Sequence, residues 1–448
     1  MTVDAPPKSR SDSSPAHAGD TPQHLIVVGG GAVGVSSAYE LAARGARVTL
    51  IDRDGFDQGA STGNAGIIAL GHPPLQRPGL VKQTLRMFLN PSNPLYIPPR
   101  LDADLLRWFW NFRKACSQPQ FDHAMKVLTE MGWLAGECFD ALVEGEQLDC
   151  EYHRTGWMEI FRTRDRMEQG REEAELVRSY GYHVDEYDGD ELREREPAIR
   201  DDVIGACHYT DSRFANPRKF VVELARAAKD RGVRVRTGVT VQRVIVDDGL
   251  ARGVALTNGE TIEADAVVLA CGIWTRDLAQ QMQVNVPMQP GKGYHVNLTE
   301  PRRCPSTVCV CSETFVAVTP IDNGLRLAGT LEFSGINHRM VQRRLDMLRI
   351  AARDYLHDLD SCTIRSTWCG LRPCTPDGLP VIGWAPGVRG AFIATGHAMM
   401  GFALGPPTGR LVAEAITGEK MSMDLAPFSP ERYRTGHRSH RSAAHAGP

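Results

Sequence analysis

The sequence predicts an α/β protein with more than one domain, and three observations lead to this fold class. The chain has 448 residues, more than the size at which a single hydrophobic core usually stops growing. Residues 24–52 read as strand, helix and strand around a glycine-rich turn. Later residues again alternate between strand and helix patterns. Such an order is typical of parallel or mixed sheets covered by helices.

The first strand–helix–strand unit carries a Rossmann-type dinucleotide-binding fingerprint. An apolar run at residues 24–28 precedes Gly29, Gly31 and Gly34 in G-x-G-x-x-G spacing, and a second apolar strand ends at Asp52. Gly29 permits the tight turn, Gly31 lets the backbone approach a pyrophosphate, and Gly34 lets the helix pack on the strand. Asp52 can accept hydrogen bonds from ribose hydroxyls. The order of all these parts makes the motif much more specific than its glycines alone.

Two further observations favour FAD over NAD as the cofactor. No second G-x-G-x-x-G follows a strand, although a reductase with a separate nicotinamide site would need one. Residues 61–66 are small and polar, so their backbone can lie against a flat ligand. From these two segments we predict these FAD-binding residues: Gly29, Gly31, Ala32, Val33, Gly34, Asp52, Arg53, Ser61, Thr62, Asn64, Ala65 and Gly66.

The charge and cysteine content exclude several classes of protein. The formal net charge is −3, so no basic field favours nucleic acid as a partner. None of the eleven cysteines has C-x-x-C spacing, and the closest pair is Cys309 and Cys311. This spacing argues against a zinc ribbon or an iron–sulfur cluster within the chain. We expect no metal site, reduced thiols and a cytoplasmic location.

Both ends of the chain are predicted to be disordered. Residues 1–22 are rich in Pro, Ser, Asp and Ala and lack the apolar stretch of a signal peptide. The tail at residues 434–448 contains three histidines, and a solvated polar tail is favoured there over a metal site. No run of 18 apolar residues occurs, so no transmembrane helix is predicted.

Residues 79–148 are predicted to be helical, and one part of them allows two interpretations. Apolar residues alternate there with cations: Leu105, Leu106, Trp108, Phe109 and Phe112 with Arg107, Arg113 and Lys114. Burial in a substrate domain is favoured. A helix lying on a membrane surface is the alternative, with peripheral association at the inner face of the membrane.

The second half of the chain predicts further elements in order. Asn216 and Pro217 open a helix that Gly232 closes. Strands are expected at 233–236, 240–246, 252–256 and 266–270, with a hairpin turn at Asn258-Gly259. Strands at 293–333 with a turn at 322–324, a helical face from 341 to 359 and a helix at 408–416 complete the pattern.

Six stretches together resemble a known family. They are VVGGGAVGVSSAYELAARGARVTLIDR (27–53), STGNAG (61–66), VVLACGIW (267–274), PGKGYHV (290–296), GLRPCTPDGLPVIG (370–383) and ATGHAMMGFALGPPTG (394–409). Over residues 24–433 the chain resembles the D-amino-acid oxidase superfamily of FAD enzymes. Within it the chain is similar to D-amino-acid dehydrogenases, glycine oxidases and D-hydroxyproline dehydrogenases.

The resemblance implies an interleaved fold. A Rossmann-type FAD-binding domain would comprise residues 23–72, 211–284 and 366–426. A substrate domain of α+β type, around a large mixed sheet, would comprise residues 73–210 and 285–365.

The resemblance also implies site residues. Arg372, in the G-L-R-P motif, would hold the substrate carboxylate. The residues after A-T-G-H would lie near the flavin, and others would line the cofactor: Val241, Gly272, Gly396, Met400, Gly401 and Phe402. His397 is a candidate proton carrier or a structural histidine. Tyr294 is a candidate for closing the substrate pocket or a core tyrosine.

Two departures from the family pattern affect this interpretation. Met399 stands where glycine oxidases tend to have an arginine, which favours a less polar substrate than glycine. Cys369 and Cys374 do not align with the cysteine that carries flavin in some relatives, so FAD is expected to bind non-covalently.

The resemblance implies amino-acid catabolism by hydride transfer from Cα to the flavin N5. The favoured hypothesis is a D-amino-acid dehydrogenase that gives an imino or 2-oxo acid. The alternatives are an oxygen-using oxidase of glycine or sarcosine type, a D-hydroxyproline dehydrogenase, and a non-catalytic flavin-binding module. The expected partners are a small amino acid and an acceptor such as a quinone, a dye or oxygen, with a redox partner subunit as a further option.

Overall fold

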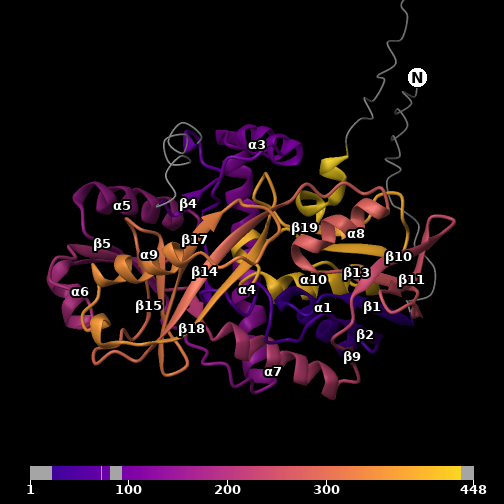
Figure 1. Ribbon diagram of the computed structural model, residues 1–448, viewed down its shortest axis with the longest axis horizontal. Coiled ribbons are helices and arrows are strands. Elements are labelled where there is room, and N and C mark those ends of the chain that lie inside the picture. The colour runs from indigo at the N-terminus through magenta and orange to yellow at the C-terminus, as the bar shows by residue number, and fades with distance from the viewer. Residues whose placement is uncertain (1–22, 72, 81–92, 435–448) are drawn as a thin grey trace, which may run out of the picture.

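Two large β-sheets, each with its own helices, dominate the computed structural model, which describes residues 23–71, 73–80 and 93–434. A six-stranded sheet occupies the right half of Figure 1 and a nine-stranded sheet the left half. The predicted arm at 1–22, the tail beyond residue 434 and residues 81–92 of the predicted helical stretch lie outside the described residues. The α/β fold class predicted from the sequence is confirmed.

The six-stranded sheet has the order β19-β20-β13-β1-β2-β9. Its strands are β1 (His24–Val28), β2 (Arg47–Ile51), β9 (Arg234–Arg236), β13 (Ala266–Leu269), β19 (Val381–Trp384) and β20 (Ala391–Thr395). Only the β19–β20 pair is antiparallel. The sheet therefore joins strands from the start, the middle and the end of the chain, with β1 between β13 and β2.

Three helices pack beside this sheet: α1 (Ala32–Ala43), α7 (Pro217–Asp230) and α10 (Gly405–Thr417). The Asn216 side chain caps α7 as predicted, accepting from the Lys219 amide at 3.3 Å. Helices α1 and α10 approach very closely, because a Cβ on Gly409 would lie 2.5 Å from the Ser36 carbonyl carbon. This contact fixes the N-termini of both helices beside the same end of the sheet.

A small antiparallel sheet and a short helix flank the six-stranded sheet. Its strands are β10 (Val241–Asp247), β11 (Leu250–Leu256) and β12 (Thr261–Glu263), and the helix is α8 (Thr275–Gln281). The predicted turn at Asn258-Gly259 joins β11 to β12.

The large sheet has the path β18-β14-β17-β16-β15-β5-β7-β6, with β4 paired to β17. The bounds are β4 (Leu95–Tyr96), β5 (Trp157–Phe161), β6 (Val184–Asp188), β7 (Gly205–Tyr209), β14 (Gln289–Thr299), β15 (Val308–Cys311), β16 (Val316–Pro320), β17 (Gly324–Glu332) and β18 (Ile364–Cys374). A two-stranded pair, β3 (Ile67–Ile68) with β8 (Arg213–Phe214), lies apart from it. Asp322 and Asn323 both have left-handed φ values, 57° and 49°, in the predicted turn between β16 and β17.

Further α-helices of the described residues are α3 (Ala103–Ala115), α4 (Gln118–Gly145), α5 (Arg164–Ser179), α6 (Gly189–Arg195) and α9 (Gln342–Arg353). Helix α9 is shorter than the helical face predicted up to residue 359. The chain leaves the helix after Arg353, and Asp358 adopts a left-handed φ of 64°. Tyr355 and Leu359 are nevertheless buried. The apolar spacing therefore predicted the burial of these residues correctly, but its prediction of the helix length was wrong.

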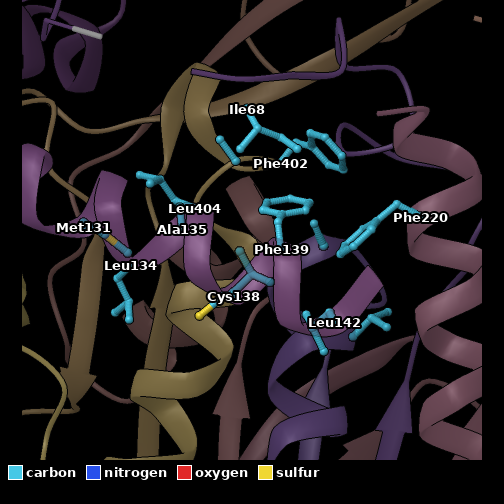
Figure 2. Close-up of a cluster of buried hydrophobic side chains, with 14 of the residues drawn as sticks. Ile68, Met131, Leu134, Ala135, Cys138, Phe139, Leu142, Phe220, Phe402 and Leu404 are labelled. Atoms are coloured by element: carbon cyan, nitrogen blue, oxygen red, sulfur yellow. The ribbon is translucent and has the colours of Figure 1, made fainter. Parts of the chain in front are cut away.

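Helix α4 joins the two halves of the molecule through an aromatic cluster (Figure 2). Its Phe139 lies 4.8 Å from the Phe220 ring of α7 and 5.4 Å from the Phe402 ring that precedes α10. Phe402 also packs edge-on against Phe220. This shared core holds the segment before α10 in place.

Helix α3 buries part of its apolar side chains, as the favoured interpretation of its sequence expected, and exposes two others. Leu105, Trp108 and Phe112 are buried, while Leu106 and Trp110 are 65% and 56% exposed. Within the described part of the chain, no helix is both long and apolar enough to cross a bilayer.

Candidate active site

The predicted phosphate cradle forms at the end of β1. Gly29 has a left-handed φ of 109°, and a Cβ there would lie 2.5 Å from the Ala270 carbonyl oxygen. A Cβ on Gly34 would lie only 1.8 Å from the Gly29 oxygen. Only glycine fits at these two positions. The N-cap residue of helix α1 is Gly31, which has no side chain, and the first turn carries no acidic residue, so this N-terminus favours an anion such as a pyrophosphate.

Asp52 and Ser61 complete the cradle. The Asp52 carboxylate accepts from the amides of Gly30 at 2.6 Å and Asp54 at 2.8 Å, and it lines the cavity. Ser61 Oγ accepts from the Ala32 amide at 3.0 Å. These bonds fix the carboxylate while leaving it lone pairs for ribose hydroxyls.

One continuous cavity runs from this cradle to the large sheet. Many of the predicted residues line it: Gly29, Gly31, Val33, Asp52, Arg53, Ser61, Asn64, Val241, Gly272, Arg372, His397, Gly401 and Phe402. Others lie just behind its wall and do not line it: Ala32, Gly34, Thr62, Ala65, Gly66, Gly396 and Met400. A long cavity with a glycine cradle, a carboxylate and an open helix N-terminus at one end fits an extended dinucleotide such as FAD.

Arg372 lies at the other end of the cavity, on β18. It pairs with Gly291 of β14, and its guanidinium lies over Gly293, where a Cβ would come within 2.4 Å of the guanidinium carbon. Its Nη1 donates to the Thr330 carbonyl oxygen at 2.6 Å. Among the described residues, no carboxylate lies within ion-pair distance of Arg372. Burial lowers the pKa of this guanidinium below its usual value, so an anionic ligand would stabilise it.

Thr330 presents its carbonyl to Arg372 through an uncommon backbone conformation. Its φ is 63°, which is rare for a β-branched residue. The register between β14 and β17 shifts at this point. The irregular strand therefore turns the Thr330 oxygen toward the guanidinium, as strained positions often do at functional sites.

Trp368 is a cavity residue that the sequence interpretation missed. Its ring stacks on His295 with a centroid distance of 5.1 Å and lies against Gly370 and Gly63, where a Cβ would clash at 2.1 Å and 2.3 Å. Positions 368, 370 and 372 are two residues apart along β18, so they share one face of the strand. From this spacing, Trp368 could have been predicted to lie on the same face as Arg372. Trp274, Cys271 and Gln281 also line the cavity without having been predicted.

His397 lines the cavity and is held from behind. Its Nε2 lies 2.9 Å from the Thr408 hydroxyl, which itself donates to the Leu404 carbonyl. The Thr408 proton is thus used, and Nε2 must donate, which leaves Nδ1 as the acceptor. Burial lowers the pKa of His397 to about 3. The imidazole is therefore neutral at physiological pH.

Tyr294 lies away from the cavity. Its side chain is 1% exposed, and its hydroxyl donates to the Glu332 carboxylate at 3.1 Å. Glu332 also pairs with the buried Lys292 at 3.1 Å. The structure brings Arg372 and His397 to one cavity and places Tyr294 in a polar cluster outside it.

All eleven cysteines are free thiols.

Comparison with known proteins agrees with this geometry. The family described as FAD dependent oxidoreductase matches residues 24–415. A D-amino acid dehydrogenase of Cereibacter sphaeroides (strain ATCC 17029) is 31% identical over 95% of this chain and 98% of its own length. Another of that description, from Methylobacterium sp. (strain 4-46), is 29% identical over 92% of this chain and 99% of its own.

Solved structures show the same fold at lower identity. Glycine oxidase from Geobacillus kaustophilus superposes with a TM-score of 0.73 at 23% identity, covering 91% of this chain and 98% of its own. L-proline dehydrogenase from P. horikoshii gives a TM-score of 0.70 at 20% identity, covering 92% and 97%.

Proposed function

The chain belongs to the family of FAD-dependent oxidoreductases, and from this premise we propose that it oxidises a small D-amino acid at its α-carbon as a dehydrogenase. The observation that carries the proposal is Arg372: a guanidinium without a carboxylate partner in the described chain, in the same cavity as the dinucleotide cradle. The names of the relatives with about 30% identity support the substrate class.

Three groups of residues would hold FAD. Gly29, Gly31 and the N-terminus of α1 suit its pyrophosphate, and Asp52 suits its ribose. Ser61, Gly63 and Asn64 line the path toward Arg372. When bound, FAD supplies the acceptor for the hydride that leaves Cα. Residues 23–72, 211–284 and 366–426 would form the domain that binds it, with residues 366–374 reaching into the large sheet as part of β18.

Arg372 would fix the substrate by its carboxylate. Its planar fork can make two parallel hydrogen bonds to a carboxylate, and the Thr330 oxygen holds the fork by Nη1. An amino acid anchored at this point keeps its α-carbon in one place, and such positioning supplies a large part of catalysis in two-partner reactions. An amine bound in its neutral form needs no side-chain base, which agrees with a neutral His397.

The cavity wall favours a substrate with an apolar side chain. Trp368 presents a rigid aromatic surface beside Arg372. Met399, which does not line the cavity, stands where glycine oxidases tend to have an arginine. These residues support a small apolar or cyclic D-amino acid, including D-proline or D-hydroxyproline, over glycine.

We also propose that the outer face of α3 rests on an anionic membrane surface, where a quinone would be the electron acceptor. The cationic groups of Arg113 and Lys114 lie 5.7 Å and 5.4 Å from the centroid of the exposed Trp110 ring, beside exposed Leu106. Apolar side chains flanked by cations suit the lipid interface. Cosedimentation with phosphatidylglycerol vesicles should fall for Trp110→Ser and stay unchanged for Ile350→Ser, an exposed apolar residue of α9.

The test of the main proposal is anaerobic titration of the purified holoenzyme. D-proline, D-alanine, the L-isomers of both and achiral glycine are added singly, and bleaching of the flavin absorption is recorded. We expect bleaching by D-isomers and rapid reoxidation by a quinone. Bleaching by L-isomers alone would contradict the stereochemistry. Rapid peroxide release in air would identify an oxidase instead of a dehydrogenase.

A further inference from the structure

Four consecutive carbonyl groups of the segment 61–66 are held by side chains of the large sheet. Arg326 Nη1 donates to the Thr62 oxygen at 3.1 Å and the Asn64 oxygen at 2.8 Å. The ring Nδ1 of His295 lies 3.0 Å from the Gly63 oxygen. Thr319 Oγ1 donates to the Ala65 oxygen at 2.6 Å. Because Gly63 and Asn64 also line the cavity, these contacts orient one of its walls.

Apart from the contact of His295, these contacts come from one transverse row of the sheet. Asn297 of β14 stands directly opposite Arg326 of β17, which stands opposite Thr319 of β16. Ser366 of β18 pairs with Asn297 on the other side. Side chains directly opposite each other in a sheet share one face. The row therefore presents one polar face to residues more than 230 positions earlier in the chain.

Arg326 is the one charged member of this row. Its side chain is 3% exposed, and in the described part of the protein no carboxylate lies within ion-pair distance of it. Its Nε donates to Asn297 Oδ1 at 3.0 Å, so neutral oxygens hold the fork on two sides. Burial accordingly lowers the pKa of this guanidinium to about 10. It remains positively charged at physiological pH.

We propose that Arg326 is a positioning residue of the cofactor site which also raises the reduction potential of bound FAD. Reduction of FAD by two electrons with uptake of one proton adds one negative charge to the flavin. A buried cation whose charge is not neutralised stabilises added negative charge nearby, because the surrounding dielectric screens it weakly. The inference rests on FAD occupying the cavity assigned to it above, and it is independent of which amino acid is oxidised.

Two substitutions alter the charge in different ways. Arg326→Met removes the cation together with two hydrogen bonds to the segment. Asn297→Asp keeps the Arg326 fork in place and sets a carboxylate 3.0 Å from its Nε, which neutralises the cation without deleting it. Asn297→Asp also removes the Nδ2 group that donates to Ser366 Oγ at 2.9 Å, so the Ser366 hydroxyl would have to donate instead, and Ser366→Ala serves as the control for this change.

One neutral member of the row provides the matched control for positioning. Thr319→Val deletes only the hydroxyl that donates to the Ala65 oxygen, with nearly unchanged shape and no change in charge. Arg326→Lys keeps the charge and loses the fork that reaches two carbonyls. Both variants should weaken FAD binding several-fold and leave the reduction potential as in the wild type.

The experiment measures the midpoint potential of the holoenzyme against a reference dye under dithionite, together with the dissociation constant of FAD. Arg326→Met and Asn297→Asp should each shift the two-electron equilibrium about tenfold toward oxidised FAD, a potential lower by about 30 mV. Wild-type potentials in both variants would overturn the proposal. An equal shift in Thr319→Val would overturn it as well, because geometry alone would then explain the effect. If Arg326→Met does not fold, Asn297→Asp decides.

No amino acid enters this measurement. Failure of the potential shift therefore leaves the proposed substrate untouched, and failure of every D-amino acid to reduce the flavin leaves the potential shift intact.

Discussion

The position of Arg372 is unfavourable for the side chain alone and favourable for binding an anion. Its burial destabilises the cation and lowers its pKa, while its single hydrogen bond to Thr330 leaves most of the fork unused. A carboxylate entering the cavity removes both costs at once. The residue is therefore ordered for an anion before the anion arrives.

Removal of this guanidinium should abolish efficient turnover. Arg372→Gln is expected to lower kcat/KM by roughly 10²-fold or more, the scale for losing one partner of a buried charge pair. Arg372→Lys should recover only part of it, because an ammonium cannot make the bidentate contact. Arg365→Gln, on the exposed part of the same strand, is the matched control. Unchanged kinetics in Arg372→Gln would remove the residue from the site.

His397 should make stability depend on pH in one direction. Its pKa is about 3 in the folded protein, whereas its ordinary value of 6.5 applies in the unfolded chain. Between these two pH values the imidazole is therefore protonated in the unfolded chain and neutral in the folded protein. The contribution of His397 to the free energy of unfolding is therefore fully present above pH 6.5. It declines as the pH falls below that value, by at most about 1.4 kcal/mol per pH unit. Urea unfolding at pH 7.5, 6 and 5 should show a smaller decline for His397→Gln than for the wild type. Replacement of exposed His123 by Gln should leave the slope unchanged.

Single residues were predictable from the sequence when local backbone requirements select them. Gly29 and Gly34 are examples, because the chain that crowds them belongs to one βαβ unit or its neighbouring strand. Arg326 and His295 were not, since their contacts join residues more than 230 positions apart. Tyr294 shows the remaining problem: alternation along β14 places it on one of two faces, and the sequence does not say which face meets the cavity.

At the scale of elements, helices α1 and α10 are packed closely against each other behind the cofactor cradle. Gly405 and Gly409 of α10 face Ala32 and Ser36 of α1, with hypothetical Cβ contacts of 2.9 Å and 2.5 Å. Side chains of any size would push the helices apart, and α1 carries the N-terminus that suits the pyrophosphate. Packing between two helices thus controls the geometry of the cradle.

Gly409→Ala is expected to destabilise the protein by about 1–3 kcal/mol through overpacking and to weaken FAD binding. Differential scanning calorimetry and FAD titration measure the two effects. Gly145→Ala, at the end of α4 with no atom within 4 Å of the added Cβ, should be neutral or slightly stabilising because alanine favours helix. A destabilised Gly145→Ala with an unaffected Gly409→Ala would contradict the packing argument.

The elements themselves were well predicted where periodicity and turn residues agree. Helix α7, with its Asn216 cap, and the hairpin at Asn258-Gly259 follow the local signals closely. Helix α9 ends earlier than its apolar spacing indicated. Residues beyond Arg353 are buried, but a turn and not the helix carries them into the core. Spacing alone reports which side chains are buried and not the backbone that carries them.

At the scale of the whole molecule, FAD should hold the two sheets together. The segment 61–66 follows β2 of the six-stranded sheet in the chain and is bound by the large sheet, so a ligand on this wall stabilises both. Added FAD at 100 times its dissociation constant should raise the free energy of unfolding by about 2.7 kcal/mol. Urea denaturation with and without FAD measures it. FMN, which lacks the adenosine half, should stabilise less, and equal effects would argue against the extended cavity as its site.

The overall architecture was only partly accessible from the sequence. The βαβ unit could be derived from its residues, and the interleaving of the chain came from the family resemblance. The order of the nine-stranded sheet could not be derived, because β5 lies beside β15, some 150 residues later. Pairing at such distances depends on which apolar faces remain after local elements have packed.

The position of β1 in its sheet has a consequence for synthesis on the ribosome. Its neighbour β13 and the outer strands β20 and β19 are translated long after it, and β20 follows β1 by about 370 residues. At translation rates of 5–20 residues per second, the first strand waits roughly 20–70 s for its last companions. The edge of β1 that β13 covers is open to wrong partners for roughly 12–50 s of that interval, because β13 follows β1 by about 240 residues. The growing polypeptide is therefore expected to depend on chaperones until β13 emerges.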